Sequence, residues 1–149
     1  MHQFRSNGSG SALLLWGAFL LILVAGASCT TMGNSYKNAR GFNLAVDQFH
    51  NAMRWEAYDT ALLFVSPPLV DDFWRLADAL QGKIRIMEYE IRQPVCDPRN
   101  GSGSVTVNVK LYRQDGPTLQ TRTVRQKWVY LAKEDIWQIV QHDLKELMN

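Results

Sequence analysis

The sequence predicts an α+β domain in which two or three helices pack on a curved antiparallel sheet of about four strands, after an N-terminal apolar signal helix. Three observations support this class. An uninterrupted apolar segment lies near the N-terminus, a helical apolar period runs through residues 42–80, and an alternating period begins at residue 84. Helices followed by a run of strands are typical of α+β domains, so we expect a single domain over residues 42–149.

The composition is that of one ordinary globular domain with a very apolar segment added. The chain has 149 residues, 46% of them hydrophobic, and its net charge of +2 comes from 16 Lys and Arg against 14 Asp and Glu. These charges are spread along the chain rather than gathered in a block. Nucleic-acid binding needs clustered cations, so the sequence gives no reason to expect a nucleic-acid partner.

The N-terminus has the zones of an export signal. His2 and Arg5 precede the apolar run "ALLLWGAFLLILVAGA" at residues 12–27. A helix of about 16 residues reaches ~24 Å, short of the ~30 Å hydrocarbon core of a bilayer. Removal of residues 1–28 as a signal peptide is therefore favoured over a permanent membrane span.

Two overlapping cleavage signals follow the apolar run. "AGA" at residues 25–27 fits ordinary signal peptidase, which would cut after Ala27. "GASC" at residues 26–29 resembles the lipobox of bacterial lipoproteins, in which the cysteine is acylated and becomes the new N-terminus. The family usually has a branched apolar residue where this chain has Gly26. The resemblance implies lipid attachment, palmitate included, at Cys29, followed by a polar tether over residues 29–41.

Lipidation would place the protein on a membrane. Each buried acyl CH₂ contributes ~0.8 kcal/mol, so two or three chains hold a domain on a bilayer. Thr30 after the cysteine resembles the pattern of lipoproteins passed to the outer membrane. The expected location is the cell envelope, at the outer membrane and facing the periplasm. Cys96 is then a structural thiol, whereas ordinary cleavage leaves a Cys29–Cys96 disulfide open.

Three stretches of residues 42–80 have the apolar spacing of helices. In the first, four apolar residues recur at intervals of three and four: Phe42, Val46, Phe49 and Met53. Gly41 or Asn43 is the expected N-cap. The second stripe covers residues 55–65. The third helix begins after Ser66, with two prolines in its first turn, and ends at Gly82.

From residue 84 onward the apolar period is that of strands. Residues 83–93 alternate with a change of parity, which predicts a β-bulge near Met87. Residues 93–104 read as a loop, and residues 104–113 and 118–132 as two strands joined by the turn "QDGPT". Residues 136–140 form the last strand, before a short helix at residues 142–148.

The last hairpin carries a family resemblance. "QKWVYLAKEDIWQIV" is similar to the final hairpin of the cone-shaped nuclear transport factor two-like and cystatin-like folds, W-x-x-x-x-x-D-G-x-W-x-I. Trp128, Asp135, Trp137 and Ile139 carry this resemblance. Ile136 stands where the family has glycine, so we expect a tighter or differently shaped turn. The resemblance covers residues 42–140.

This resemblance implies a pocket between the concave sheet and the helices, lined by aromatic residues. The candidates are Trp55, Tyr58, Trp74, Tyr89, Tyr112 and Trp128, and a packed core is the alternative reading of the same residues. Some members place a carboxylate in the pocket, where burial raises its pKa toward the range of a general base. Asp59 and Glu88 are the candidates here. Glu88 and Glu90 either point inward or are turned to solvent by the bulge.

No metal or cofactor is predicted. His142 and Glu146 could share a helix face, but two ligands fall short of the three or four that zinc takes. Alternation places Arg125 and Lys127 on one face of a strand, either as a small basic patch for an anionic envelope surface or as part of a solvated face.

Two functions remain at this point. The first is a membrane-anchored envelope lipoprotein with a small non-enzymatic binding domain, whose partner is an envelope protein or a second copy of the chain. The second is a small-molecule binding protein or enzyme that takes a small hydrophobic ligand and uses a pocket carboxylate as base.

Overall fold

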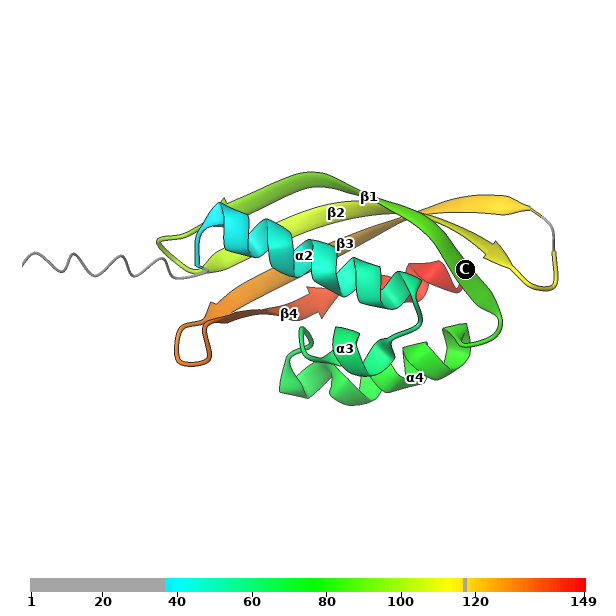
Figure 1. Ribbon diagram of the computed structural model, residues 1–149, viewed down its shortest axis with the longest axis horizontal. Coiled ribbons are helices and arrows are strands. Elements are labelled where there is room, and N and C mark those ends of the chain that lie inside the picture. The colour runs from blue at the N-terminus through cyan, green and yellow to red at the C-terminus, as the bar shows by residue number, and fades with distance from the viewer. Residues whose placement is uncertain (1–36, 117) are drawn as a thin grey trace, which may run out of the picture. The chain divides into compact units, whose positions relative to one another are not determined.

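The computed structural model describes residues 37–116 and 118–149. The predicted signal peptide, Cys29 and the tether up to residue 36 lie outside this part of the chain. The elements follow one another as α2 (Ala39–Arg54), α3 (Tyr58–Leu62), the 3₁₀ helix η1 (Pro67–Leu69), α4 (Val70–Leu80), β1 (Ile84–Asp97), β2 (Ser102–Arg113), β3 (Leu119–Leu131), β4 (Ile136–His142) and the 3₁₀ helix η2 (Leu144–Leu147) (Figure 1). The predicted α+β class is confirmed.

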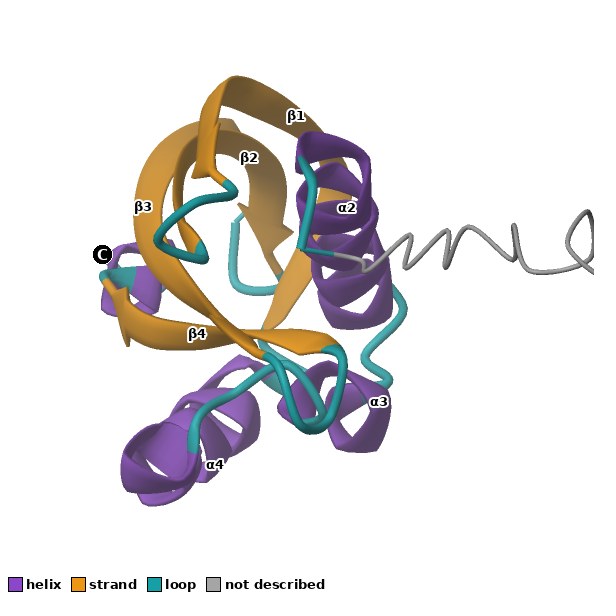
Figure 2. Ribbon diagram, turned by 90° about the vertical axis from the view of Figure 1, so that its left-hand side faces the viewer, coloured by secondary structure: helices purple, strands orange, loops and turns teal. Residues whose placement is uncertain are grey.

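The four strands form one antiparallel sheet in the order β1-β2-β3-β4. The sheet is strongly curved and α2 lies along its concave side, while α3 and α4 lie beyond β4 (Figure 2). Val65 pairs with Ile139 as a parallel bridge, through Ser66 N–H to Ile139 O at 3.0 Å and Ile139 N–H to Phe64 O at 2.7 Å. This segment therefore covers part of the outer edge of β4.

The predicted bulge in β1 is confirmed, because the pairing with β2 shifts register between Ile86 and Glu88. Beyond it, Glu88 and Glu90 point to solvent. The prediction that residues 93–104 form a loop is wrong for all but residues 98–101, because β1 runs to Asp97 and β2 begins at Ser102. A second irregularity between Arg92 and Val95, with Gln93 at φ 47°, lets β1 continue to Asp97. An edge strand tolerates such bulges because it is hydrogen-bonded to a neighbouring strand on one side only.

Helix α2 begins about one turn earlier than predicted, at Ala39. Its N-cap is Asn38, whose side-chain oxygen accepts a hydrogen bond from Gly41 N–H at 2.8 Å. The predicted caps, Gly41 and Asn43, lie inside the first turn. The error arose because Ala39 and Arg40 carry no apolar period, although both are good helix formers.

The cap gives a simple test of this assignment. We expect Asn38→Ala to lower the free energy of unfolding by about 1 kcal/mol, because one helix N–H loses its acceptor. Asn43→Ala is the matched control, since Asn43 is exposed within the helix and should change stability little. Urea unfolding of both variants measures the difference, and equal effects would contradict the cap at Asn38.

The core lies between α2 and the concave face of the sheet. Phe42 of α2 contacts Trp128 at 6.1 Å and Trp137 at 5.0 Å between ring centroids, and Phe49 contacts Trp128 at 6.0 Å. Strand β2 contributes its alternate residues: Val105, Val107, Val109 and Leu111. Trp128, Trp137 and Ile139 of the last hairpin are all buried, as the inward face of that hairpin requires.

Gly103 lets α2 lie close to β2. A Cβ atom at this position would stand 2.6 Å from Cε2 and 2.8 Å from Cζ of Phe42. The ring of Phe42 thus occupies the space that a side chain would fill, and it packs on Trp128, the residue paired with Gly103 across the sheet. The contact makes Gly103 a packing requirement rather than a flexible point.

The β3–β4 turn accommodates the missing glycine through Asp135. Asp135 adopts φ 54°, a left-handed conformation that Asp reaches more easily than most residues. Its carboxylate accepts a hydrogen bond from the Tyr130 hydroxyl. Ile136 then starts β4 directly, so the turn is closed by the aspartate itself.

Candidate functional site

The six aromatic candidates do not line one common pocket. Trp128 is only 1% exposed and lies at the centre of the core, and Tyr58 is also buried. Trp74 and Tyr89 are half-buried, on α4 and β1. Trp55 is 67% exposed and shares a small pocket of about 200 Å³ with Tyr112. The structure therefore divides this set between the core and the surface.

The two candidate bases both lie at the surface. Asp59 is exposed on α3. Glu88 is exposed on β1 and forms an ion pair with Lys110 at 2.8 Å. The hydrogen bond and charge of Lys110 lower the pKa of Glu88, the opposite of the shift that a general base needs. Among the described residues, the buried polar or charged side chains are His50, Ser66 and Gln126.

A cluster of buried polar side chains lies between α2 and the concave face of the sheet. Gln126 Oε1 is 3.2 Å from His50 Nε2 and accepts a hydrogen bond from Trp128 Nε1 at 3.3 Å. An indole nitrogen can only donate, so Gln126 must present its oxygen at this point. It follows that His50 Nε2 carries the proton that bonds to the same oxygen. Gln126 Nε2 is left as a buried donor with no partner among the described residues.

His50 is neutral in this surrounding. Burial lowers its pKa from 6.5 to about 4, against the hydrogen bond that His50 donates to Gln126 and the charge of Asp47, which raise the pKa. The His50 ring lies 5.5 Å from the ring of Tyr89, whose hydroxyl donates to Asp47 Oδ1 at 2.8 Å. The cluster thus joins α2 to β1 and β3 through polar contacts as well as apolar packing.

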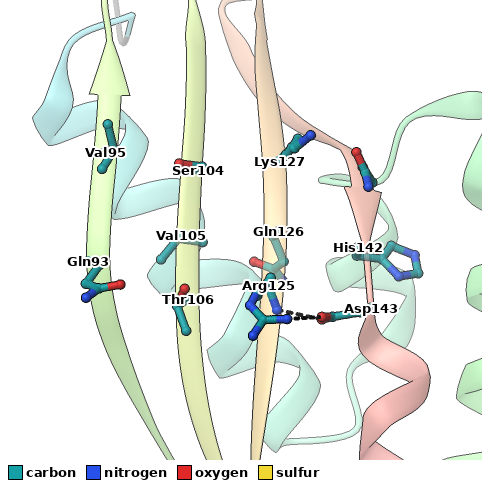
Figure 3. Close-up of a pocket in the computed structure, with 11 residues that line it drawn as sticks. Gln93, Val95, Ser104, Val105, Thr106, Arg125, Gln126, Lys127, His142 and Asp143 are labelled. Atoms are coloured by element: carbon teal, nitrogen blue, oxygen red, sulfur yellow. Dashed lines mark hydrogen bonds and ion pairs between the residues drawn. The ribbon is translucent and has the colours of Figure 1, made fainter.

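A groove of about 460 Å³ lies on the opposite, convex face of the sheet (Figure 3). All four strands contribute to it, because outward-facing residues of adjacent strands stand side by side in this register. Most of its lining is polar: Gln93, Ser104, Thr106, Arg125, Lys127, Gln141, His142 and Asp143, with Val95. Val105 and Gln126 also border it, although both residues are buried and lie on the inward side of their strands. Two cations, Arg125 and Lys127, alternate along β3 on this face. The predicted basic patch is therefore part of a hollowed surface.

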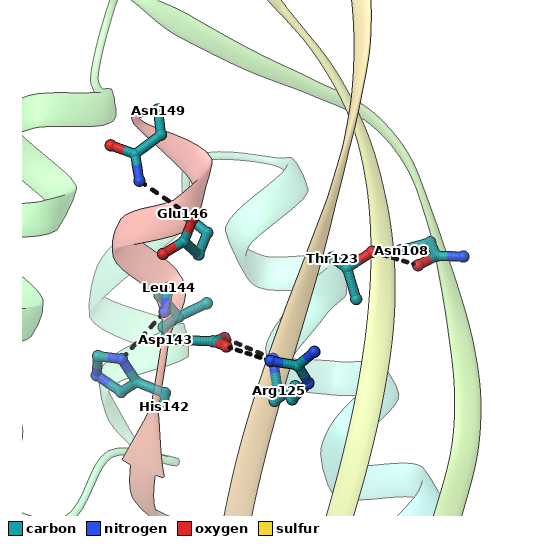
Figure 4. Close-up of polar contacts among 8 residues, drawn as sticks. All are labelled: Asn108, Thr123, Arg125, His142, Asp143, Leu144, Glu146 and Asn149. Carbon is teal, nitrogen blue, oxygen red and sulfur yellow. Dashed lines mark hydrogen bonds and ion pairs between the residues drawn. The ribbon is translucent and has the colours of Figure 1, made fainter.

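Asp143 holds one end of this groove in place (Figure 4). Its Oδ1 accepts a hydrogen bond from Arg125 N–H at 2.5 Å, and Asp143 N–H donates to Arg125 O at 3.2 Å. Its Oδ2 lies 3.9 Å from Arg125 Nη1, a long ion pair. Beside it, His142 Nδ1 accepts from Leu144 N–H at 3.3 Å, and burial lowers the pKa of His142. The groove therefore ends in a neutral imidazole and a carboxylate that is already engaged.

The groove continues toward the β1–β2 turn. A second hollow of about 300 Å³ shares Val95, Ser104 and Lys127 with it. Here the surface is more apolar, because Val95 is 61% exposed and Val140 is turned outward by a bulge in β4. We call the two hollows together the outer-sheet groove. Its polar and apolar halves suit the binding of an extended molecule better than the enclosure of a small substrate.

A group of metal-binding side chains and a helix that could cross a membrane are both absent from the described residues. Residues 37–116 and 118–149 contain no group of three His, Cys, Asp or Glu side chains placed to hold a metal ion. Within the same ranges, no helix combines the length and apolar character that a bilayer span requires.

Cys96 lies at the end of β1 where the chain enters the domain. It is half-buried, and its Sγ donates weakly to Lys37 O at 3.9 Å. Burial and the charge of Asp97 raise the pKa of its thiol, so the thiolate is disfavoured. Lys37 Nζ donates to Arg99 O at 3.1 Å. The entry of the chain is thus joined to the β1–β2 turn.

Sequence reasoning did not single out Gln126, His50 or Asp143. Strand parity could have revealed Gln126, because it alternates with Val124 and Trp128 on the inward side of β3. His50 lies on the same helix face as Val46 and Met53, so its burial could also have been predicted from the sequence. Asp143 gave no signal, since its role depends on the pairing of two strand ends.

Comparison with known proteins identifies the fold alone. No protein-family profile matches the chain, and no curated protein matches it. Among solved structures, a ketosteroid isomerase-like protein from Erwinia carotovora atroseptica matches with a TM-score of 0.54 at 10% identity, over 67% of this chain and 88% of that one. A SEC-C motif containing protein from Rhodopseudomonas palustris matches with a TM-score of 0.54 at 15% identity, over 63% and 70% of the two chains. The first supports the cone-shaped, nuclear transport factor two-like fold that the last hairpin predicts.

Proposed function

We propose that this chain is an exported lipoprotein, anchored through acylated Cys29, whose domain binds another component of the cell envelope through the outer-sheet groove. The observation that carries the binding role is the contrast between the two faces of the sheet. The concave face is filled by large side chains such as Phe42, Phe49 and Trp128, whereas the convex face is hollowed and polar. The component can be a protein, a second copy of this chain included.

The position of Lys37, the first described residue of the domain, supports the anchoring role. The "GASC" cysteine precedes Lys37 by about eight residues, which span at most ~27 Å when extended. Lys37 lies at the β1–β2 turn, so the anchor would hold this end of the domain near the bilayer. The apolar half of the outer-sheet groove lies at this end, and its polar half extends along the sheet away from it.

The alternative of a pocket carboxylate acting as a base has less support. Asp59 and Glu88 face solvent, and the pKa of Glu88 is lowered by Lys110. The ketosteroid isomerase-like neighbour shares the fold at an identity too low to extend its activity to this chain. A binding module therefore accounts better for the arrangement of these residues.

Lipid labelling tests the anchor. The full chain, expressed in a bacterium with an outer membrane and grown with radiolabelled palmitate, is expected to carry label and to sediment with membranes. Cys29→Ala should lose both, because no acyl chain remains to bury. Cys96→Ala is the matched control and should keep both. Mass spectrometry that finds a mature N-terminus at Ser28 without acyl mass would overturn the lipoprotein assignment.

A further inference from the structure

A second surface, separate from the groove, lies where α2 ends. It is a pocket of about 200 Å³ lined by Arg54, Trp55, Arg85, Ile86, Met87 and Tyr112, which we call the Trp55 pocket. Trp55 is 67% exposed and Met87 is 45% exposed. Large side chains that are exposed together, rather than singly, mark interaction sites on soluble proteins.

Local backbone geometry brings these residues together. Arg85, Tyr112 and Leu119 are directly paired across β1, β2 and β3, so they form a row on the outer face of the sheet. The bulge in β1 leaves Met87 without a partner in β2 and turns it outward at the edge. Trp55 follows the last residue of α2. Glu56 then adopts φ 55°, so the helical stripe stops and the indole stays outside the core.

The charges in this pocket have one sign. Its lining contains two arginines and no carboxylate. The Arg54 guanidinium lies 5.5 Å from the Trp55 ring centre, in the range of a cation–π contact. Arg85 makes no ion pair with any residue in the described ranges. Glu88 nearby is paired with Lys110, and its charge also interacts with that of Arg54, whereas Arg85 is not among the charges that act on it.

The pocket also lies far from the point where the chain enters the domain. Helix α2 has 16 residues and is about 24 Å long, with Asn38 at one end and Trp55 at the other. In Figure 1 the first turn of α2 lies at the opposite end of that helix from the start of β1. A partner at the Trp55 pocket would therefore not need to pass the tether.

We propose that the Trp55 pocket binds an acidic segment of a partner protein, with one apolar side chain of that segment seated between Trp55 and Tyr112. The volume suits one or two side chains, which excludes a large enclosed ligand. Arg54 and Arg85 supply donors for carboxylates on either side of the apolar anchor, and guanidinium groups bind carboxylates through paired N–H donors. Trp, Tyr, Met and Arg are also the residue types enriched at protein interfaces.

Fluorescence anisotropy with defined peptides tests this assignment. The full chain, purified in a neutral detergent, is titrated against fluorescein-labelled Glu-Asp-Glu-Phe-Glu-Asp-Glu. A basic peptide, Lys-Arg-Lys-Phe-Lys-Arg-Lys, and an acidic peptide with Gly in place of Phe serve as controls. We expect the first peptide to bind at least about tenfold more tightly than either control, and added salt to weaken it. Equal binding of the acidic and basic peptides would overturn the proposal.

Variants locate the binding on the protein. Trp55→Ala and Arg85→Glu are each expected to weaken the acidic peptide by about tenfold or more, since the first removes the apolar contact and the second reverses a charge. Arg40→Glu makes the same charge change at the exposed start of α2 and should have little effect. Lys127→Glu, in the outer-sheet groove, should likewise leave this binding unchanged. If Lys127→Glu weakens it as strongly as Arg85→Glu, the peptide binds in the groove and the proposal fails.

Vesicles distinguish a protein partner from a lipid surface. Cys29→Ala protein is mixed with vesicles of anionic phospholipid and with neutral vesicles, and sedimentation measures binding. We expect Trp55→Ala to leave vesicle binding unchanged in this background. Loss of anionic-vesicle binding in the Trp55→Ala variant, with no peptide binding in the parent chain, would assign the pocket to a membrane instead. Failure of the palmitate labelling would remove the anchor but not this result, because peptide binding does not depend on acylation.

Discussion

Replacing Gly103 by alanine is expected to lower the free energy of unfolding by about 2 to 3 kcal/mol. The added Cβ would stand 2.6 Å from a ring carbon of Phe42, closer than real Cβ contacts allow. Phe42 has little room to retreat, because Trp128 and Trp137 hold the other sides of its ring. Alanine has no unfavourable backbone requirement here, so the loss would come from the contact itself.

A double-mutant cycle separates this contact from other effects. Urea unfolding is measured for Gly103→Ala, for Phe42→Leu, and for the two together. The cost of Gly103→Ala should fall when Phe42 is already leucine, because the edge of the ring that blocks the Cβ is gone. Gly116→Ala is the matched control, since nothing lies within 4 Å of a Cβ built there. Equal costs in the two backgrounds would contradict the close approach.

Acid is expected to destabilise the domain through His50. The pKa of His50 is about 4 in the folded chain and 6.5 for an unperturbed histidine, so the unfolded chain takes up the proton first. The stability from the neutral ring is complete above pH 6.5 and is lost as the pH falls toward 4. At about 1.36 kcal/mol for each pH unit in that window, the loss reaches about 3 kcal/mol.

His50→Gln isolates this effect. The glutamine amide can still donate to Gln126 but does not titrate in this range. We expect unfolding free energies of the parent chain and the variant to diverge between pH 7 and pH 4, with the parent falling further. His142, whose pKa burial also lowers, is present in both proteins and its contribution cancels in the difference. Parallel pH profiles would contradict a buried, neutral His50.

The helices and strands of this domain could be predicted from the sequence where the apolar residues recur at a regular helical or alternating spacing. The parity change at Met87 predicted the bulge, and the alternation of β2 predicted its buried face. The continuation of β1 through Pro94 could not be predicted, because Gln93 and Pro94 look like the start of a loop in isolation. The strand persists there because β2 offers a partner on one side.

The candidate site was harder to predict because it depends on which aromatics face inward. Trp55 and Trp128 are the same residue type, yet Trp55 is exposed at the end of a helix and Trp128 lies at the centre of the core. The left-handed conformation of Glu56 decides the first case, and no sequence rule marks a glutamate for it. The hollow on the convex face likewise depends on which residues of adjacent strands stand side by side, and alternation within one strand does not specify that register.

The strand order also affects how the sheet can assemble during folding. Each strand of the sheet pairs only with its neighbours in the chain, so β1 to β4 can assemble as successive hairpins with short loops to close. The bridge between Val65 and Ile139 is different, because it joins segments on either side of three strands. The entropy cost of closing a long loop is therefore concentrated at that bridge, which requires Ile139 of β4 to be in place before Val65 can pair with it.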